Sequence, residues 1–154
     1  MVAWTEKMTL GAITMLEENN SLCRLLIGEF SQPNVEFRKT PLLSTAFDLL
    51  DAYLRGEKQT FSELSLSPKG TPFQQKVWGV LRSIPYGATR SYAEVAAQIG
   101  CSKGCRAVGM ANHANPLPII IPCHRVIEKN GGLGGYAFGL DYKRKLLSIE
   151  GVLS

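Results

Sequence analysis

The chain has 154 residues, of which 45% are hydrophobic and 19% charged, and its formal net charge at pH 7 is +4. This length suits one ordinary domain or two small ones, and the composition excludes a disordered chain. The apolar stretch from Pro116 to Pro122 is interrupted by proline and is far shorter than the roughly 20 residues of a membrane span. Because Met1 to Glu6 lack the pattern of a signal peptide, we expect a cytoplasmic protein with reduced cysteines and no membrane segment.

The charge is unevenly distributed along the chain. Residues 1–68 carry 6 Lys/Arg against 9 Asp/Glu, a net charge of −3, whereas residues 69–154 carry 11 against 4, a net charge of +7. A basic half favours a polyanionic partner such as DNA, but it also fits a basic surface without a partner. The charge alone does not separate these alternatives.

The N-terminal part predicts a small sheet and one helix. Apolar-rich runs at 12–16 and 22–27, joined by polar residues, are typical of a β-hairpin. Leu42 to Leu54 has apolar residues at helical spacing, followed by Gly56. We interpret Ser65 to Gly70 as a linker and place a domain boundary there, between 1–68 and 69–154.

The C-terminal part predicts a series of capped helices. Thr71 precedes Pro72 and a helix that ends before Pro85, and Ser91 begins a second capping box with Glu94. That short helix, a turn at Gly100 and a helix from about 103 to 112 form the pattern of a helix-turn-helix, although many helical pairs share it. A final amphipathic helix is expected at 142–149.

The segment from Asn115 to Val126 holds the strongest candidate chemistry, since it contains Pro-Cys-His-Arg-Val. A cysteine is nucleophilic as the thiolate, and a free thiol with a pKa of about 8.5 is mostly protonated at neutral pH. His124 supplies a base and Arg125 a permanent charge directly after Cys123, although adjacency does not guarantee contact. The alternative is a buried structural cysteine beside a surface His-Arg pair.

With these motifs the chain resembles the O6-alkylguanine-DNA alkyltransferases, a family of DNA-repair proteins. The resemblance rests on the Asn-Pro at 115–116 placed eight residues before Cys123, and on Pro-Cys-His-Arg-Val itself. It extends over roughly residues 71–151, through the strings at 71–78, 106–109, 134–136 and 146–151. Residues 1–68 carry much less of the pattern.

The resemblance implies a catalytic set. Cys123 would accept the alkyl group by direct displacement, His124 would take the thiol proton through a bound water, and Glu150 would orient and stabilise the imidazolium. Asn115 would hold the turn before an active-site strand by bonds from its side chain to the backbone, although an ordinary Asn-Pro turn has the same sequence.

The resemblance also implies that the damaged nucleotide is flipped out of duplex DNA. Arg106 would fill the gap from a recognition helix in the minor groove, and Tyr92 would assist rotation and donate a hydrogen bond to the base. Ser91, Ala107 and Arg125 complete the expected DNA contacts. Taken alone, Arg106 equally fits an exposed helix charge and Tyr92 a half-buried aromatic, and the small residues of this helix equally fit close helix packing.

The expected substrate pocket consists of the following residues: Tyr92, Pro118, Val126, Tyr136, Ala137 and Phe138. Glycines at 131, 132, 134 and 135 would let the backbone approach the purine. Some relatives have a small residue where Phe138 stands, so we expect methyl adducts to react faster than benzyl adducts.

We expect no metal and no cofactor. Cys101 and Cys105 offer only two ligands, Cys23 is remote in sequence, and no histidine precedes His113. His113 itself is expected to lie at the surface or to face a phosphate rather than to act in catalysis.

These patterns and the resemblance together predict an α+β protein. Residues 1–68 would form a ribonuclease H-like antiparallel sheet with a helix, and residues 69–154 a helical domain with a winged-helix-type helix-turn-helix. The expected function is irreversible, single-turnover transfer from O6-alkylguanine to Cys123 by a monomer bound to double-stranded DNA. Acceptance of O4-alkylthymine is left open.

Three other functions fit parts of the sequence. An alkyltransferase-like lesion binder would lack the acceptor Cys123. A thiol hydrolase would need an oxyanion hole and gives no reason for a basic helix-turn-helix. A transcription factor would not explain Pro-Cys-His-Arg-Val.

Overall fold

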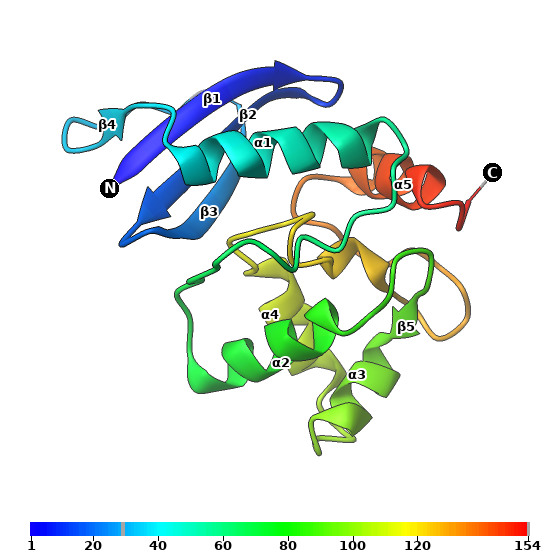
Figure 1. The fold of residues 1–154 in the computed structure, drawn as a ribbon. Coiled ribbons are helices and arrows are strands. Elements are labelled where there is room, and N and C mark those ends of the chain that lie inside the picture. Colours follow the sequence, from blue (N-terminus) through cyan, green and yellow to red (C-terminus); the bar gives the residue numbers. More distant parts are fainter. Residues whose placement is uncertain (29, 154) are drawn as a thin grey trace. The chain divides into compact units, whose positions relative to one another are not determined.

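The computed structural model describes residues 1–28 and 30–153. The chain divides into two compact units, Met1–Lys69 and Gly70–Ser154 (Figure 1). Each unit contains buried hydrophobic residues of its own. Over the described residues, none of the helices combines the length and the apolar character needed to cross a bilayer.

The first unit is built on a four-stranded sheet with the order β3-β2-β1-β4. β2 (Gly11–Glu18) and β3 (Ser21–Ile27) form the predicted hairpin, and Asn19 and Asn20 adopt the positive φ angles that its tight turn requires. β1 (Val2–Met8) pairs antiparallel with β2 and parallel with the short β4 (Glu36–Phe37). The sequence reading had not identified β1.

Helix α1 (Pro41–Leu54) packs on this sheet and closes the core of the first unit (Figure 1). The Thr40 side chain accepts a hydrogen bond from the backbone N–H of Leu43, and Pro41 occupies the first helical position, where no N–H is needed. The apolar residues predicted to face inward are buried: Leu43, Phe47, Leu50 and Leu54.

The second unit contains a helical cluster. α2 (Pro72–Arg82) and α3 (Tyr92–Gln98) both begin with the predicted capping boxes. α4 (Cys105–His113) packs against both, and the indole N–H of Trp78 in α2 donates to the carbonyl of Ala111 in α4 at 2.9 Å. The pair α3 and α4 thus has the predicted helix-turn-helix arrangement, and the mixed α+β class is confirmed.

Two short elements and the last helix complete the second unit. β5 (Arg90–Ser91) pairs in parallel with β6 (Val126–Ile127), so the start of α3 lies beside the segment that follows Cys123. A single 3₁₀ turn covers Cys123–Arg125, and α5 (Leu140–Ile149) packs against it. Through these contacts one cluster contains the candidate cysteine, the helix-turn-helix and Glu150.

Candidate active site

Cys123 begins the 3₁₀ turn rather than lying in a strand, which corrects the expectation of an active-site strand. The loop before it is held by Asn115, whose amide N–H donates to the carbonyl of Ile121 at 2.8 Å and whose oxygen accepts from the N–H of Leu117 at 3.0 Å. Between these two bonds Ile119 has a φ of 75°, an unfavourable conformation for a β-branched residue. Asn115 therefore stabilises a strained turn that fixes the position of Cys123.

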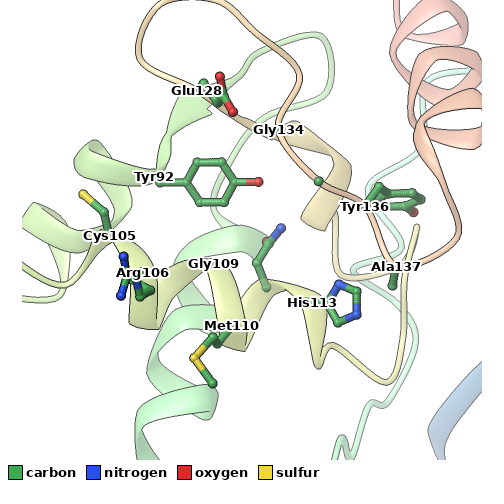
Figure 2. A pocket seen from close by; sticks show the side chains of 12 residues that line it. Tyr92, Cys105, Arg106, Gly109, Met110, His113, Glu128, Gly134, Tyr136 and Ala137 are labelled. Atoms are coloured by element: carbon green, nitrogen blue, oxygen red, sulfur yellow. The ribbon is translucent and has the colours of Figure 1, made fainter.

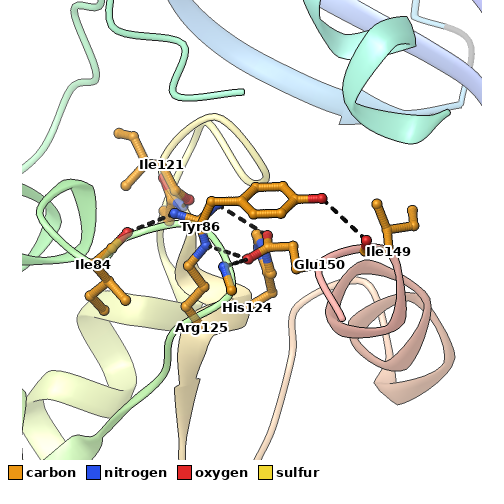
Figure 3. Close-up of polar contacts among 9 residues, drawn as sticks. Ile84, Tyr86, Ile121, His124, Arg125, Ile149 and Glu150 are labelled. Carbon is orange, nitrogen blue, oxygen red and sulfur yellow. Dashed lines mark hydrogen bonds and ion pairs between the residues drawn. The ribbon is translucent and has the colours of Figure 1, made fainter. Parts of the chain in front are cut away.

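His124, Arg125 and Glu150 form a buried polar cluster next to this turn. Nε2 of His124 lies 2.6 Å from Oε2 of Glu150. Nε of Arg125 donates to Oε1 of the same carboxylate at 2.9 Å, and Nη2 of Arg125 donates to Oε2 at 3.1 Å. Figure 3 shows the carboxylate of Glu150 between the imidazole and the guanidinium. This two-point contact fixes the plane of the carboxylate and so the orientation of the imidazole.

The segment after α2 completes the cluster with backbone groups. The N–H of Gly87 donates to Oε1 of Glu150 at 3.0 Å, and the carbonyl of Ile84 accepts from Arg125 at 2.7 Å. The ring of Tyr86 lies 5.8 Å from the guanidinium carbon of Arg125, and its hydroxyl donates to the carbonyl of Ile149 (Figure 3). No sequence motif marks Ile84 or Gly87, because they contact the cluster through backbone groups, which most residue types share.

The side chain of Arg125 is buried, which gives no support to its expected contact with DNA, and that contact stays a prediction. This side chain is only 7% exposed, and its donors are directed to Glu150 and Ile84 inside the second unit. The physical reason is electrostatic: the buried carboxylate of Glu150 needs a buried cation, and Arg125 supplies it. Arg125 is therefore a positioning residue for the imidazole of His124.

Burial and hydrogen bonding set the charge states of the cluster. Burial raises the pKa of the Cys123 thiol, although hydrogen bonds from Asn115 and Tyr136 and the charge of Lys143 act in the opposite direction. Burial lowers the pKa of His124, although Glu150 partly offsets this. At neutral pH the site therefore holds a protonated Cys123 thiol, which can give up a proton, and a neutral His124 imidazole, which can accept one.

Glu150 remains ionised. Burial alone would raise the pKa of its carboxyl, but the hydrogen bond and charge of His124, with donors on Arg125 and Gly87, lower it to about 2. A fixed carboxylate accepts the Nε2 hydrogen of the neutral imidazole, which makes Nδ1 the atom that takes up a proton. The negative charge then favours the imidazolium that forms.

A cavity of about 650 Å³ opens beside this cluster (Figure 2). It is bounded by Tyr92 at the start of α3, by one face of α4 and by the loop from 128 to 137. Two of its lining residues also contact Cys123. The Asn112 amide donates a hydrogen bond to the Cys123 carbonyl at 3.2 Å, and the Tyr136 hydroxyl forms a hydrogen bond with the thiol. The cysteine, only 3% exposed, is therefore in contact with two residues of the cavity wall but does not itself line the cavity.

The cavity wall requires glycine where the loop passes Tyr92. Gly134 has a φ of 70°, and a Cβ atom there would lie 2.8 Å from the Tyr92 hydroxyl oxygen. Any side chain at this position would displace the ring of Tyr92. The predicted use of Gly134 for close approach thus has a geometric basis, but the neighbour in the structure is Tyr92.

The expected DNA and pocket residues divide into two groups. Those that line the cavity are Tyr92, Arg106, Tyr136 and Ala137. Pro118 and Val126 are buried and do not line this cavity, and their assignment to the substrate pocket stays a prediction.

Three further expected residues lie close to these walls without lining the cavity. Phe138 packs edge-on against Tyr136, with ring centroids 5.9 Å apart. Ser91 is buried as the N-cap of α3, where its hydroxyl accepts from the N–H of Glu94, and Ala107 is exposed on α4. The expected contacts of Ser91 and Ala107 with DNA, and the expected place of Phe138 in the substrate pocket, stay predictions.

The cavity also has walls that the sequence reading had not assigned to it. They are Cys105, Gly109, Met110, Asn112 and Glu128. His113 also lines the cavity and is exposed at the end of α4, as expected of a surface residue. The helical spacing of Arg106, Met110 and His113 could have identified this face of α4, because residues four and three positions apart share one side of a helix.

Lys143, in the predicted C-terminal amphipathic helix, is a buried cation in the interior of the second unit. Its ammonium donates to the carbonyls of Val126 at 2.7 Å, Gly135 at 3.1 Å and Leu133. Burial lowers its pKa to about 8, although the Cys123 and Glu128 charges raise it. Lys143 therefore connects α5 both to β6, through Val126, and to the loop that follows β6, through Leu133 and Gly135.

The described residues contain no group of three or more His, Cys, Asp or Glu side chains arranged to hold a metal ion. Cys23 and Cys123 are buried free thiols, and Cys101 and Cys105 are exposed ones.

Comparison with known proteins matches both units. Residues 2–68 match the ribonuclease-like domain of 6-O-methylguanine DNA methyltransferase, and residues 72–152 match its DNA binding domain. The constitutive methylated-DNA–protein-cysteine methyltransferase of Bacillus subtilis is 47% identical over 95% of this chain and 93% of its own length. The Mycobacterium bovis protein of that name is 44% identical, with coverage of 92% and 87%.

A solved structure has the same fold. The crystal structure of Mycobacterium tuberculosis OGT in complex with DNA superimposes with a TM-score of 0.87 at 40% identity, covering 98% of this chain and 93% of that one. The chain belongs to the 6-O-methylguanine DNA methyltransferase family.

Proposed function

We propose that this protein repairs DNA by transferring the alkyl group of O6-alkylguanine irreversibly to Cys123, one group per chain. The observation that carries the proposal is the position of Cys123, which is contacted by two residues of the cavity wall and is followed by a neutral His124 held by Glu150. The names of the relatives from B. subtilis and M. bovis support the same reaction.

The proposed reaction is a direct displacement. The thiol proton of Cys123 passes to His124, the sulfur forms a bond to the alkyl carbon, and the bond between that carbon and guanine O6 breaks. The electron pair of the broken bond stays on the guanine, which takes up one proton, and the imidazolium of His124 gives up the proton it received, so that the thiol hydrogen is in effect exchanged for the alkyl group. Glu150 stabilises the imidazolium, and Asn115 positions the sulfur.

A single thioether product explains why the protein would act once. The carbon–sulfur bond of an S-alkylcysteine has no adjacent carbonyl, so water does not cleave it as it cleaves the thioester of a cysteine hydrolase. His124 and Glu150 assist removal of the thiol proton from Cys123, and this role does not extend to removing the alkyl group afterwards. The spent protein would therefore accumulate in proportion to the repaired DNA.

The size and lining of the cavity support a flipped base as its occupant. A base inside a duplex cannot reach a buried thiol, so the nucleotide must rotate out of the stack. Tyr92 and Arg106 both line the cavity; Tyr92 would donate a hydrogen bond to the extruded base, and Arg106 would fill the gap that the base leaves. The relative from M. tuberculosis, crystallised with DNA, supports DNA as the partner.

Residues 69–154 would form the DNA-binding and alkyl-acceptor domain, and residues 1–68 a separate ribonuclease-like domain. The net charge of +7 on residues 69–154 fits contact with phosphates, so affinity for duplex DNA should fall steeply with salt. We propose a monomer acting in the cytoplasm, where exposed thiols such as Cys101 and Cys105 stay reduced.

The test is a titration of the protein with an oligonucleotide duplex that contains one O6-methylguanine. Restored guanine is measured by chromatography of the digested DNA, at several ratios of DNA to protein. The proposal predicts that repair stops at one equivalent per chain however long the incubation. Repair beyond one equivalent would indicate a turnover enzyme, and tight binding without repair would indicate a lesion sensor.

A further inference from the structure

One face of α4 carries three side chains of different chemistry at helical spacing. Arg106, Met110 and His113 occupy positions i, i+4 and i+7, so they form a single stripe along the helix. All three line the cavity, and Figure 2 shows them on the α4 side, across from the loop that holds Gly134 and Tyr136. We call these three residues the α4 stripe.

Met110 is the unusual member of this stripe. Its exposed fraction is 70%, compared with 47% for Met1, 44% for Phe37 and 41% for Leu140, the other large hydrophobic residues that the structure records as exposed. A single exposed apolar side chain is ordinary on a protein surface. Met110, however, lies between a guanidinium and an imidazole at the rim of the cavity proposed to hold a base.

The chemistry of duplex DNA gives this position a use. A nucleotide that leaves the stack exposes the apolar faces of its two neighbours, and proteins that bind the minor groove insert apolar side chains, methionine among them, against such faces. Methionine suits this task because it is unbranched and polarisable and adapts to an irregular surface. A helix turn is 5.4 Å in pitch, so Met110 follows Arg106 by about one turn along the groove.

The other residues of the same face leave room for that contact. Gly109, beside Met110, has no side chain, and a Cβ there would already lie 3.9 Å from the ring of Tyr92. Ala107 is small and exposed. Met110 is therefore the only large apolar group on the exposed face of α4, and it lies between two large polar ones, Arg106 and His113.

We propose that Met110 is a second wedge residue, which enters the minor groove one turn after Arg106 and packs against the bases exposed when the damaged nucleotide flips out. Arg106 occupies the gap itself, and Met110 covers the apolar surface beside it. This inference rests on the proposed function, since it requires a base that leaves the duplex. A wedge acts only on stacked DNA, so Met110 should contribute more to the repair of a duplex than to the reaction with a free base.

The experiment compares three substrates for the full-length protein: a duplex with one O6-methylguanine, the same strand alone, and the free base O6-benzylguanine. Rates of alkyl transfer to Cys123 are measured by mass spectrometry for the wild type, Met110→Ala, Met110→Leu and the control Leu140→Ala. Because Met110 and Leu140 are both exposed, their replacement leaves the core intact.

We expect Met110→Ala to slow transfer from the duplex about fivefold to tenfold, the size of effect set by losing one partly buried apolar side chain. Because Met110 also lines the cavity, transfer from the free base can slow slightly, but by several-fold less than transfer from the duplex, and transfer from the single strand should slow by an intermediate factor. Met110→Leu should retain most of the duplex rate, and Leu140→Ala should retain all of it. Equal slowing on all substrates, or none on any, would overturn the wedge.

A second measurement separates this inference from the proposed function. Binding of each protein to a duplex with 2-aminopurine beside the lesion reports unstacking as a rise in fluorescence. The rise should be smaller with Met110→Ala than with the wild type at saturating protein, and an equal rise would overturn the inference. A wild type that unstacks the duplex but transfers no alkyl group would contradict the proposed function alone.

Discussion

The imidazole of His124 and the carboxylate of Glu150 are joined by a contact of 2.6 Å between Nε2 and Oε2, and both side chains are fully buried. The same carboxylate binds Arg125 through two nitrogens. Glu150 thus serves two purposes: it orients the base that is proposed to receive the thiol proton, and it balances a buried cation. The first role predicts an effect of Glu150 on the rate of repair, and the second predicts an effect on stability.

Replacing Glu150 by Gln should impair both stability and repair. Loss of the negative charge leaves the guanidinium of Arg125 buried without a counter-ion, which should lower the free energy of unfolding by about 3 kcal/mol. The imidazolium also loses its stabilising partner, so single-turnover repair should slow by about a hundredfold or more. Urea denaturation and rapid-quench repair assays measure the two effects.

Asp141→Asn is the matched control, because Asp141 is a carboxylate on the same C-terminal helix but is 91% exposed. It should change neither quantity measurably. Wild-type repair by Glu150→Gln would show that the carboxylate has no part in the reaction.

The pH dependence of stability and rate should report His124. Burial lowers its pKa in the folded protein below the ordinary 6.5, so the unfolded chain binds the extra proton first as pH falls. Stability is therefore greatest above pH 6.5 and declines below it. Glu150 affects stability in the same direction at lower pH. Its contribution to the free energy of unfolding is complete above pH 4.5 and is lost as the pH falls towards its folded pKa of about 2.

The rate of repair should decline only after the pH passes the folded pKa of His124, because a protonated imidazole cannot accept the thiol proton. Single-turnover rates between pH 5 and pH 8 test this, at pH values where circular dichroism shows the protein folded. An acid limb with its midpoint above 6.5 would argue against a buried neutral base. His113→Gln, which removes the exposed histidine, should leave the limb unchanged.

Lys143→Met should loosen the cavity wall. The ammonium of Lys143 is the donor shared by the carbonyls of Val126, Leu133 and Gly135, so the variant leaves buried acceptors unpaired. We expect a loss of about 2 kcal/mol in stability, faster hydrogen exchange at residues 133–135, and slower repair. Lys145→Met, an exposed lysine on the same helix, is the control. Unchanged exchange at residues 133–135 would contradict this role.

Phe138 should limit the size of the adduct. Its ring packs edge-on against Tyr136, a wall of the cavity, so a bulky adduct must displace an aromatic pair. We expect methyl to react faster than benzyl with the wild type, and Phe138→Gly to raise the benzyl rate relative to the methyl rate. Competition between the two modified oligonucleotides measures the ratio. Equal methyl and benzyl rates in the wild type would refute this prediction.

The parts of the fold predicted from the sequence were those governed by local chemistry. The capping boxes at Thr71 and Ser91 involve groups three residues apart, so the sequence alone specified where α2 and α3 begin. β1 was missed because only Ala3 is fully buried along it, and the strand lacks the alternation that marks a half-buried strand. Its partners β2 and β4 define it through long-range pairing.

The candidate site follows the same division. Cys123, His124 and Glu150 could be named from the family resemblance, whereas the burial of Arg125 and Lys143 could not be inferred. Both cations resemble surface residues in sequence, and only the folded second unit brings a carboxylate to one and three carbonyls to the other. Long side chains that pair with backbone carbonyls leave no pattern in a single sequence.

The central claim is tested most directly by the intact mass of the protein after incubation with a duplex containing one O6-methylguanine. Wild type and Cys123→Ala are compared at equal concentrations, and the modified residue is located by peptide mapping. Our account predicts that the wild type gains the mass of one methyl group in place of the thiol hydrogen of Cys123, and that Cys123→Ala gains nothing. A wild type without added mass, or methyl on any other residue, would contradict it.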